Sequence, residues 1–519
     1  MSMGTFHGLE VAKKALFAQQ RGLYTTGHNI ANVNTDGYSR QRANFTTSQP
    51  YPPQTFFKPK MPGQIGTGVE IGTVERVRDQ FLDFQYRIEN SRASYWAKRS
   101  EALSRMEELL NEPSDNGLAK TIDRFWQSLH DLVDNVDNAG ARSVVAQRGL
   151  AVAETLNYLS RSLQSIRMDL RDQIDVSVGR VNSLIRQIND INEQIAKIEP
   201  HGLLPNDLYD ARDRLIDELS NYFNIRVHYT SSSPGAPEIA DGLASIELLD
   251  SRGNSIGNGV FLLDVRGVGS IKDAINELYV EYGDDPYKSV SKIGVKGYEG
   301  IDDLALLDSI GQISALARAY GYGDDGMEEG EVNYPYILSE LDKLARELAK
   351  AFNEQHKAGV DLYGNSGDDV EDFFIINGDG AEITAENITV NPNILKDPNL
   401  IAASLPDQGS RNANNALELA NVFDKEIANL KDSSIRNFYT LLIGEIGVKG
   451  QEAVRMKENT EILRTQVEEQ RMSVSAVSLD EEMTNLIRFQ HAYNAAARNI
   501  TALDEMLDRI INNMGLVGR

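Results

Sequence analysis

A glycine-rich stretch in the middle of the chain has the spacing of a phosphate-binding loop. Gly321, Gly323 and Gly326 match the G-x-G-x-x-G pattern of dinucleotide-binding proteins. In those proteins the glycines follow a strand and open a helix, whose backbone amides surround the pyrophosphate. Here they follow an alanine-rich stretch with helical spacing, and Glu328 and Glu329 place negative charge where a phosphate would lie. The context therefore argues against nucleotide binding.

Acidic residues gather at two further places. The segment from Asp361 to Asn365 has a faint similarity to a calcium loop but lacks its ligand pattern, so an acidic turn explains it better. Ser478 and Glu481 have the spacing of a capping box, in which a hydroxyl and a carboxylate each bind a backbone amide at a helix N-terminus. We interpret the acidic run 480–482 as a helix start rather than a metal or acid–base site.

The composition gives no support to other chemistry. The seven histidines have no close ligand spacing, and the absence of cysteine excludes disulfides, thiol catalysis and cysteine zinc sites. A net charge of −25 argues against nucleic acid and against anionic membranes as partners. We find no apolar run that could span a bilayer, and the first ten residues lack the features of a cleaved signal peptide. We expect no enzymatic activity, no cofactor and no metal.

The strongest pattern is a seven-residue repeat at each end of the chain. Every seventh residue is apolar from Leu9 to Ile30 and again from Leu479 to Leu507. This spacing is typical of helices that pack against a partner along their length. We expect the two ends to pair and to carry an assembly interface. The residues expected in it are Leu9, Leu16, Leu23, Asn29, Ile30, Asn32, Val33, Leu486, Phe489, Tyr493, Ile500, Leu503, Leu507 and Ile510.

Between these ends the apolar spacing changes twice. Residues 142–199 contain no proline and keep three- and four-residue apolar spacing, which predicts a long bundle helix. After Phe223 apolar and polar residues alternate and glycine is frequent, which predicts strands. We expect a mainly α, elongated, multi-domain protein, with a coiled-coil-like end, a helical bundle next and a β-rich insert outermost. The expected parts are 1–48 with 475–519 as the inner terminal unit, 49–72 as a linker, 73–224 with 326–474 as the bundle, in which 359–410 are loops and short strands, and 225–325 as the insert.

The polar stretch after the first repeat resembles a known family. The residues Asn29-Ile30-Ala31-Asn32, followed by Thr35-Asp36-Gly37-Tyr38, are similar to the signature of the flagellar rod and hook family of axial proteins. The sequence Gly37-Tyr38-Ser39-Arg40-Gln41 is similar to its hook-associated members, whereas hook proteins usually carry Gly-Phe followed by a lysine. Segments 205–213, 348–364 and 479–498 agree, so the resemblance covers both termini and the bundle.

The resemblance implies a structural part of the bacterial flagellum that joins the hook to the filament. It implies export to the cell exterior without a cleaved signal peptide, and assembly as a ring on the distal end of the hook. The implied partners are further copies of the chain, the hook protein, a second hook-associated protein and a flagellar export chaperone. In such an assembly we expect Asn29 and Asn32 to fix the register between neighbours through their side-chain amides.

Other interpretations stay open at this point. A hook or distal rod protein of the same family is the main alternative, although the Ser-Arg-Gln sequence after Tyr38 argues against it. An enzyme or adhesin module in the β insert is a remote alternative, because the insert carries no motif. The asparagines and glycines of residues 25–41 would also fit a fraying helix end, since both residue types are weak helix formers.

Overall fold

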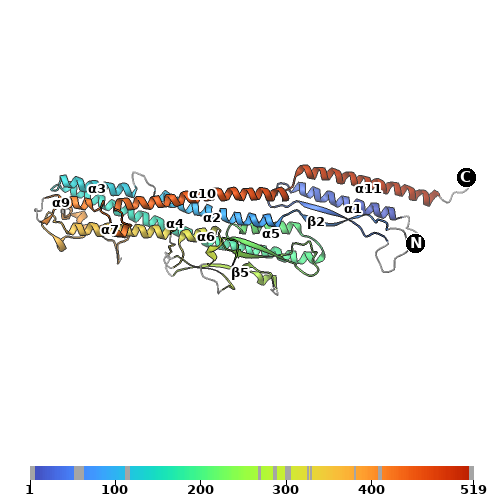
Figure 1. Cartoon of the computed structure of the whole chain (residues 1–519), viewed down its shortest axis with the longest axis horizontal. Coiled ribbons are helices and arrows are strands. Elements are labelled where there is room, and N and C mark those ends of the chain that lie inside the picture. The colour runs from blue at the N-terminus through green and yellow to red at the C-terminus, as the bar shows by residue number, and fades with distance from the viewer. Residues whose placement is uncertain are drawn as a thin grey trace.

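The protein is a long rod whose main helices run close to its long axis, as the computed structural model shows (Figure 1). In the described part of the chain, helices dominate and four small antiparallel sheets accompany them, which confirms the expected fold class. The structure describes residues 6–51, 64–110, 117–266, 270–283, 289–298, 305–323, 326–327, 330–378, 381–406 and 412–513.

The narrow end of the rod is built from both ends of the chain. Helix α1 (His7–Ala31) lies between helix α11 (Leu479–Asn513) and a hairpin of strands β1 (Gln41–Thr47) and β2 (Val69–Arg76). The hairpin pairs Gln41 with Arg76 at its base. Strand β2 begins inside the segment 49–72 that we expected to be a linker, and residues 52–63 lie outside the described part of the chain. We call these elements the terminal unit.

Long helices form the bundle beside the terminal unit. Helix α10 (Ile435–Ser475) packs along α2 (Gln80–Leu110), and α4 (Ala139–Ile198) packs on α3 (Leu118–Asp134), α5 (Asn206–Leu219), α6 (Gln312–Tyr320) and α7 (Tyr334–Lys357). The uninterrupted apolar spacing makes α4 sixty residues long, and the Asn138 side chain caps its start by accepting a bond from the Gly140 amide.

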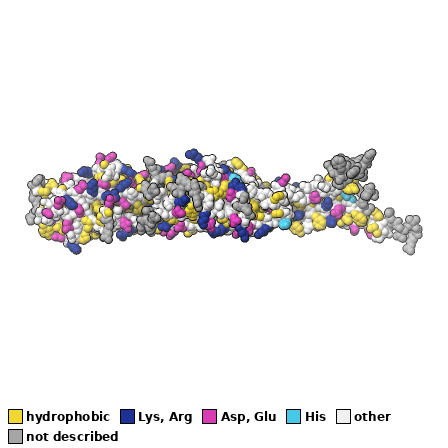
Figure 2. Space-filling view, turned by 90° about the horizontal axis from the view of Figure 1, so that it is seen from below, with side chains coloured by type: hydrophobic (Ala, Val, Ile, Leu, Met, Phe, Trp, Pro, Cys, Tyr) yellow, Lys and Arg dark blue, Asp and Glu magenta, His cyan; other side chains and the backbone are white. Residues whose placement is uncertain are grey.

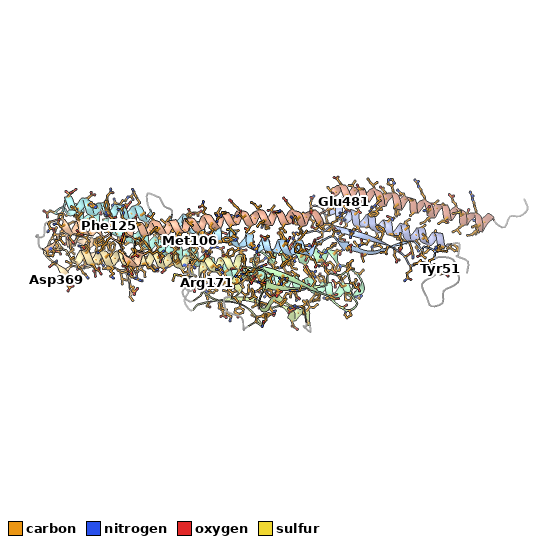
Figure 3. The ribbon with its side chains drawn as sticks, in the orientation of Figure 1. Tyr51, Met106, Phe125, Arg171, Asp369 and Glu481 are labelled. Atoms are coloured by element: carbon orange, nitrogen blue, oxygen red, sulfur yellow. The ribbon has the colours of Figure 1, made fainter. Side chains whose placement is uncertain are left out.

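An aromatic cluster closes the far end of the bundle. Phe125, labelled in Figure 3, lies 5.4 Å from Phe352 and 5.5 Å from Phe423 between ring centroids. The surrounding elements are α9 (Asn414–Asn421), α8 (Pro392–Lys396) and the short strands β8 (Phe374–Ile376) and β9 (Ile388–Val390). This end of the rod therefore has a dense aromatic core, which is continuous with the apolar core of the bundle.

The β-rich insert shares the core of the bundle. Strands β3 (Ile225–Thr230), β4 (Leu243–Leu249) and β5 (Ser255–Leu263) form one sheet, and β6 (Leu278–Tyr282) with β7 (Val290–Val295) forms another. Amides of α4 hold the insert by donating to its backbone, from Asn192 to Ala244 (3.0 Å) and from Asn182 to Leu278 (2.8 Å). The insert therefore lies against the side of the bundle (Figure 1).

Two of the stretches first considered for chemistry are turns or loops where the structure describes them, and residues 324–325 and 328–329 of the glycine-rich stretch lie outside the described residues. The Asp361 carboxylate accepts bonds from the backbone amides of Tyr363 (2.9 Å) and Asn365 (2.8 Å), which confirms an acidic turn. Gly321 follows helix α6 and not a strand, as its context predicted. In the described ranges, no group of three or more histidines, aspartates and glutamates is placed to hold a metal ion. Nor does any described helix have the length and apolarity to cross a membrane.

Candidate assembly interface

Helices α1 and α11 approach closely because small residues of α1 face α11. A Cβ atom at Gly8 would lie 3.3 Å from Leu503, and one at Gly22 would lie 3.3 Å from Phe489. Gly22 also meets the hairpin, since its Cβ would lie 3.1 Å from Phe45. Phe45 and Phe489 are themselves 5.5 Å apart between ring centroids. The glycines therefore let three elements meet around one aromatic pair.

The predicted apolar interface residues lie along the pair of helices α1 and α11, but the two helices bury them only in part. A side chain between two helices that lack a third neighbour keeps part of its surface in water. The residues that are half-buried are Leu9, Leu16, Leu23, Ile30, Val33, Leu486, Phe489, Tyr493, Ile500, Leu503 and Leu507. Ile510 is 43% exposed, and Phe17, Tyr24, Ile487 and Ile511 are also exposed. Apolar side chains accordingly remain visible on the narrow end (Figure 2).

Apart from Asn29, the fully buried positions of α1 differ from the predicted ones. They are Ala12, Ala18, Gly22, Thr26 and Asn29, which follow an adjacent stripe of the helix. Small and polar residues therefore make the contact inside one chain, whereas the leucine repeat lies at its border. That the leucines pack against neighbouring copies stays a prediction.

Asn29 acts inside the chain, which corrects the role that we expected for it. Its side-chain oxygen accepts bonds from the Tyr38 hydroxyl (2.7 Å) and the Gln41 backbone amide (3.0 Å). Its side-chain amide donates to the Gln41 carbonyl (2.8 Å). A side chain that is 1% exposed and bonded in this way pins the turn between α1 and β1, and does not reach a neighbouring copy.

Asn32 is likewise occupied within its own turn. Its side-chain amide donates to the His28 carbonyl (3.0 Å), and its oxygen accepts a bond from the Thr35 hydroxyl (3.2 Å). These bonds complete the last turn of α1, where backbone carbonyls have no partner within the helix. The asparagines therefore stabilise a defined helix end, and the interpretation as a fraying end is wrong.

Arg40 connects the two C-terminal helices across the break between them. Its backbone amide donates to the Ser475 carbonyl (2.9 Å) at the end of α10, and its guanidinium binds Glu481 (2.5 Å) and Glu482 (2.8 Å) in the first turn of α11. Glu481, labelled in Figure 3, thus pairs with arginine and not with a serine amide as the capping box predicted. Arg40 fixes the direction in which α11 leaves the bundle.

An ionic cluster joins the terminal unit to the bundle, and we call this region the waist. Arg76, at the end of β2, binds Asp210 (2.8 Å) and Asp213 (2.9 Å) of α5, and also pairs with Asp241. Arg78 binds Asp83 of α2 through two nitrogens, at 2.6 and 3.0 Å.

The cluster continues onto the long helices. Arg87 of α2 and Arg471 of α10 both bind Asp217, at 2.8 and 2.6 Å. A buried charge is costly unless charged partners surround it, as they do here. The terminal unit is therefore attached to the bundle through charge pairs on β2, α2, α5 and α10.

The electrostatics follow from this crowding. Burial alone would raise the pKa of Asp213, but the guanidiniums of Arg78 and Arg76 outweigh burial and hold that pKa well below its usual range. Burial raises the pKa of Asp210 in spite of its contact with Arg76. Burial, together with Asp213, raises the pKa of Tyr229 to about 12, so its hydroxyl stays protonated and donates to Asp213 (3.1 Å).

Sequence reasoning missed this cluster, although two local signals were present. Asp210, Asp213 and Asp217 recur at three- and four-residue spacing on one face of α5, and Arg76 and Arg78 are two residues apart, on one side of an extended segment. Either pattern alone more often indicates a solvated face. Only the fold shows that the two faces meet.

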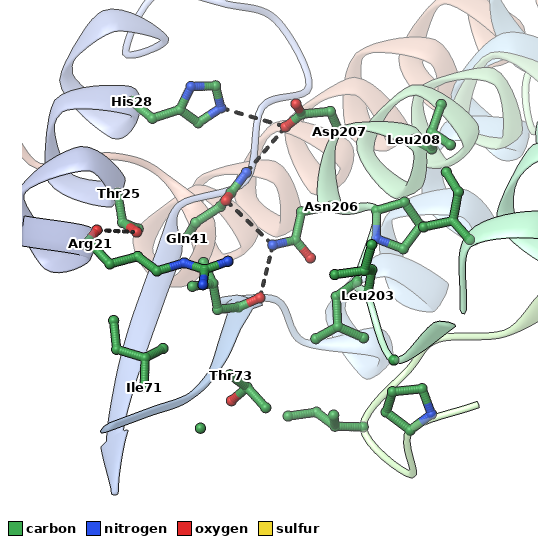
Figure 4. A pocket seen from close by; sticks show the side chains of 18 of the residues that line it. Arg21, Thr25, His28, Gln41, Ile71, Thr73, Leu203, Asn206, Asp207 and Leu208 are labelled. Atoms are coloured by element: carbon green, nitrogen blue, oxygen red, sulfur yellow. Dashed lines mark hydrogen bonds and ion pairs between the residues drawn. The ribbon is translucent and has the colours of Figure 1, made fainter. Parts of the chain in front are cut away.

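A hollow of about 830 Å³ lies beside the waist, between α1, the hairpin and residues 198–208 (Figure 4). Its wall is a chain of polar contacts. His28 lies 3.5 Å from Asp207, which also accepts a bond from the Gln41 side chain (3.1 Å). Asn206 donates to Gln41 (3.3 Å) and to the Val74 carbonyl (3.0 Å). These contacts hold the first helix and the hairpin onto α5, so the hollow is part of a joint.

Three family descriptions match segments of the chain. "Flagellar hook-associated protein FlgK helical domain" matches residues 103–374, "Flagellar basal body rod FlgEFG protein C-terminal" matches 468–514, and "Flagella basal body rod protein" matches 9–38. The first covers the insert and the part of the bundle from the end of α2 through α7 to β8, and the other two cover the paired terminal helices. The segments that meet in the terminal unit are thus the ones that resemble rod proteins.

Full-length relatives agree with these matches. The chain is 45% identical to flagellar hook-associated protein 1 of Bacillus subtilis over 99% of both chains. It is 24% identical to the protein of the same name from Escherichia coli, over 96% of this chain and 98% of that one. Its fold is similar to the solved "flagellar hook junction protein FlgK from Burkholderia pseudomallei", with a TM-score of 0.58 and 15% identity, over 76% of this chain and 100% of that one.

Proposed function

The chain belongs to the flagellar hook-associated protein 1 family, and on that premise we propose that it joins the flagellar hook to the filament. We propose that its copies form a ring on the distal end of the hook, outside the cell, and that it has a structural and not an enzymatic role. The hook protein would lie on one side of the ring and a second hook-associated protein on the other. A flagellar export chaperone would bind the chain before export.

The incomplete burial of the terminal pair is the observation that carries this proposal. The far end of the bundle has a closed aromatic core, whereas the seam of α1 and α11 leaves its leucines and isoleucines half in water. Complete burial of such a side chain is worth about 1.5–3 kcal/mol, so a half-buried one can still gain about 1 kcal/mol from a neighbour. About ten of these residues would give a ring a substantial driving force.

The waist supports the same role, because a junction has to hold two structures at a fixed angle. Arg40 binds both α10 and α11, while Arg76 and Arg78 bind α5 and α2. An assembly interface on the terminal unit would therefore position the bundle and the insert as well. This rigid connection distinguishes a junction subunit from a flexible adhesin.

Addition to isolated hooks tests the proposal. We expect the full chain to appear as a discrete cap on hook tips in electron micrographs, and a chain that lacks residues 475–519 to leave the tips bare. A sharper variant replaces the half-buried Leu486 and Ile500 by serine, with Thr484 and Thr501, both exposed on α11, replaced by serine as the matched control. Addition along a growing hook would favour a hook or rod protein, and no addition by the full chain would refute the junction role.

A further inference from the structure

Helix α10 exposes an apolar row on the side that faces away from the bundle. It packs along α2, with smaller contacts to α7 and α3. Its outer side carries Leu441, Val448 and Ile462, and Val448 is 68% exposed. Arg455 lies seven residues after Val448 and seven before Ile462, so Leu441, Val448, Arg455 and Ile462 follow one another every seven residues. Seven-residue spacing is the pattern of a helix that packs against a second helix.

Helix α4 exposes a second row. Tyr158 and Val176 are eighteen residues apart, which is five helical turns and places them on one side of the helix. Both are largely exposed, Val176 to 73%. Asp169 lies between them on the same side, and a hollow of about 370 Å³ next to Tyr158 is lined by Arg161 and Ser162.

The two rows lie on different sides of the bundle. α10 makes its main contact with α2, and α4 packs on α3, α5 and α6. In Figure 1 α10 follows the upper edge of the rod, with α2 and α4 below it. One chain therefore presents both rows outward at the same time.

The rows also lie at similar heights along the rod. Arg471 of α10 binds Asp217 (2.6 Å), and Arg180 of α4 binds the adjacent Glu218 (2.5 Å), so these two arginines mark one level. From that level Val448 is 23 residues back along α10, and Tyr158 is 22 residues back along α4. At 1.5 Å per residue the two differ in height by about 2 Å, and Ile462 and Val176 differ by about 8 Å.

The charges within the two rows are complementary. Arg455 lies between Val448 and Ile462, and Asp169 lies between Tyr158 and Val176. Both side chains are exposed, and within the described chain neither belongs to an ion pair. Each row therefore has a charged residue between two apolar ones, and the charge is positive in the row of α10 and negative in the row of α4.

We propose that the outer row of α10 on one copy packs against the outer row of α4 on the next copy around the ring. By the same rise Arg455 and Asp169 differ in height by about 8 Å, so the long Arg455 side chain reaches along the contact to the Asp169 carboxylate of the neighbouring copy, between the apolar contacts. Because the two surfaces differ, the contact is heterologous, and its repetition generates a closed ring or a helical array. The proposal rests on the proposed function and names the contact between neighbouring bundles, in addition to the terminal helices.

Cysteine crosslinking tests the contact directly, since the native chain contains no cysteine. The full-length double variant V448C/Y158C is added to isolated hooks and oxidised. Disulfides need Cα atoms within about 7 Å, so we expect a ladder of crosslinked oligomers on a non-reducing gel. Each single variant should give at most dimers. The matched control pairs Y158C with L417C on the exposed face of α9 and should give no ladder.

Charge reversal supplies a second, independent measurement. R455D should reduce the amount of protein on hook tips about tenfold, and D169R in the same chain should restore it, whereas R455K should behave as the native chain. The contact is overturned if the native chain caps hooks while V448C/Y158C gives no ladder, or while R455D adds as well as the native chain. Failure of the native chain itself to cap hooks would refute the proposed function, and this contact with it.

Discussion

Replacement of Asp213 by asparagine should lower the free energy of unfolding by about 3–5 kcal/mol, the cost of removing one partner from a buried ion pair. The substitution keeps the shape of the side chain and removes its charge. Asp213 is 2% exposed and faces three arginines, with Arg76 at 2.9 Å, Arg78 at 3.5 Å and Arg87 at 3.6 Å. It also accepts a bond from the Tyr229 hydroxyl (3.1 Å).

The magnitude follows from these distances. Opposite charges about 3 Å apart attract by about 5 kcal/mol at an effective dielectric constant near 20. The desolvation of the carboxylate cancels part of this sum, and the remaining aspartates of the cluster still neutralise part of the arginine charge. After this cancellation the expected net loss is about 3–5 kcal/mol, which is no more than the attraction within a single pair. The lost stability should mainly weaken the attachment of the terminal unit to the bundle.

Urea denaturation followed by circular dichroism measures the effect, and proteolysis locates it. E218Q is the matched control, because Glu218 lies on the same helix but pairs with Arg180 at the surface, where such pairs contribute about 1 kcal/mol or less. D213N should also make the chain near residues 76–80 more sensitive to protease. Equal losses in D213N and E218Q, or a loss below about 1 kcal/mol in D213N, would show that the cluster does not hold the waist.

Three further predictions concern the far end, the helix break and the terminal pair. Burial lowers the pKa of His356 from its usual 6.5 to about 4, so the stability that depends on its neutral form is complete above pH 6.5 and is lost as the pH falls toward 4. Urea titrations at pH 6.5 and pH 4 should therefore differ by roughly 3 kcal/mol in the free energy of unfolding. H356Q should make this free energy depend less on pH. R40A should increase amide hydrogen exchange in the first turns of α11 at least tenfold, whereas R42A, at an exposed position two residues further on, should leave it unchanged. G22L should clash with Phe45 and Phe489 and abolish addition to hooks, whereas G27L, whose added Cβ atom meets no atom within 4 Å, should add normally.

Sequence spacing predicted the elements of this fold where the signal is local. The leucine repeat of residues 9–30 and the long apolar run of α4 describe the faces of single helices, so each indicated a helix. For α1 the buried side is the adjacent stripe of small and polar residues, which the repeat did not indicate. The position of the insert could not be predicted in this way. Its attachment depends on Asn182 and Asn192 of α4 meeting strands that come far later in the chain.

The candidate interface shows the same division. The apolar residues of α1 and α11 lie on the expected pair, but Asn29 binds Gln41 across a turn, and Glu481 binds an arginine 441 residues away. A polar side chain can bond to many partners, and the sequence does not show which of them the fold brings close to it. The waist cluster is the extreme case, because Arg76, Asp213 and Arg471 come from three segments, each of which by itself resembles a solvated surface.

The waist also determines how the rod carries mechanical load. The chain crosses it at only two places, before α2 and between α10 and α11, and charge pairs bridge the space beside both crossings. A force that bends the rod there has to pull Arg40 from Glu482 and Arg78 from Asp83, whose carboxylates are 3% and 6% exposed, and buried pairs are little screened by salt. The bending stiffness of the subunit should therefore stay nearly constant between fresh and salt water.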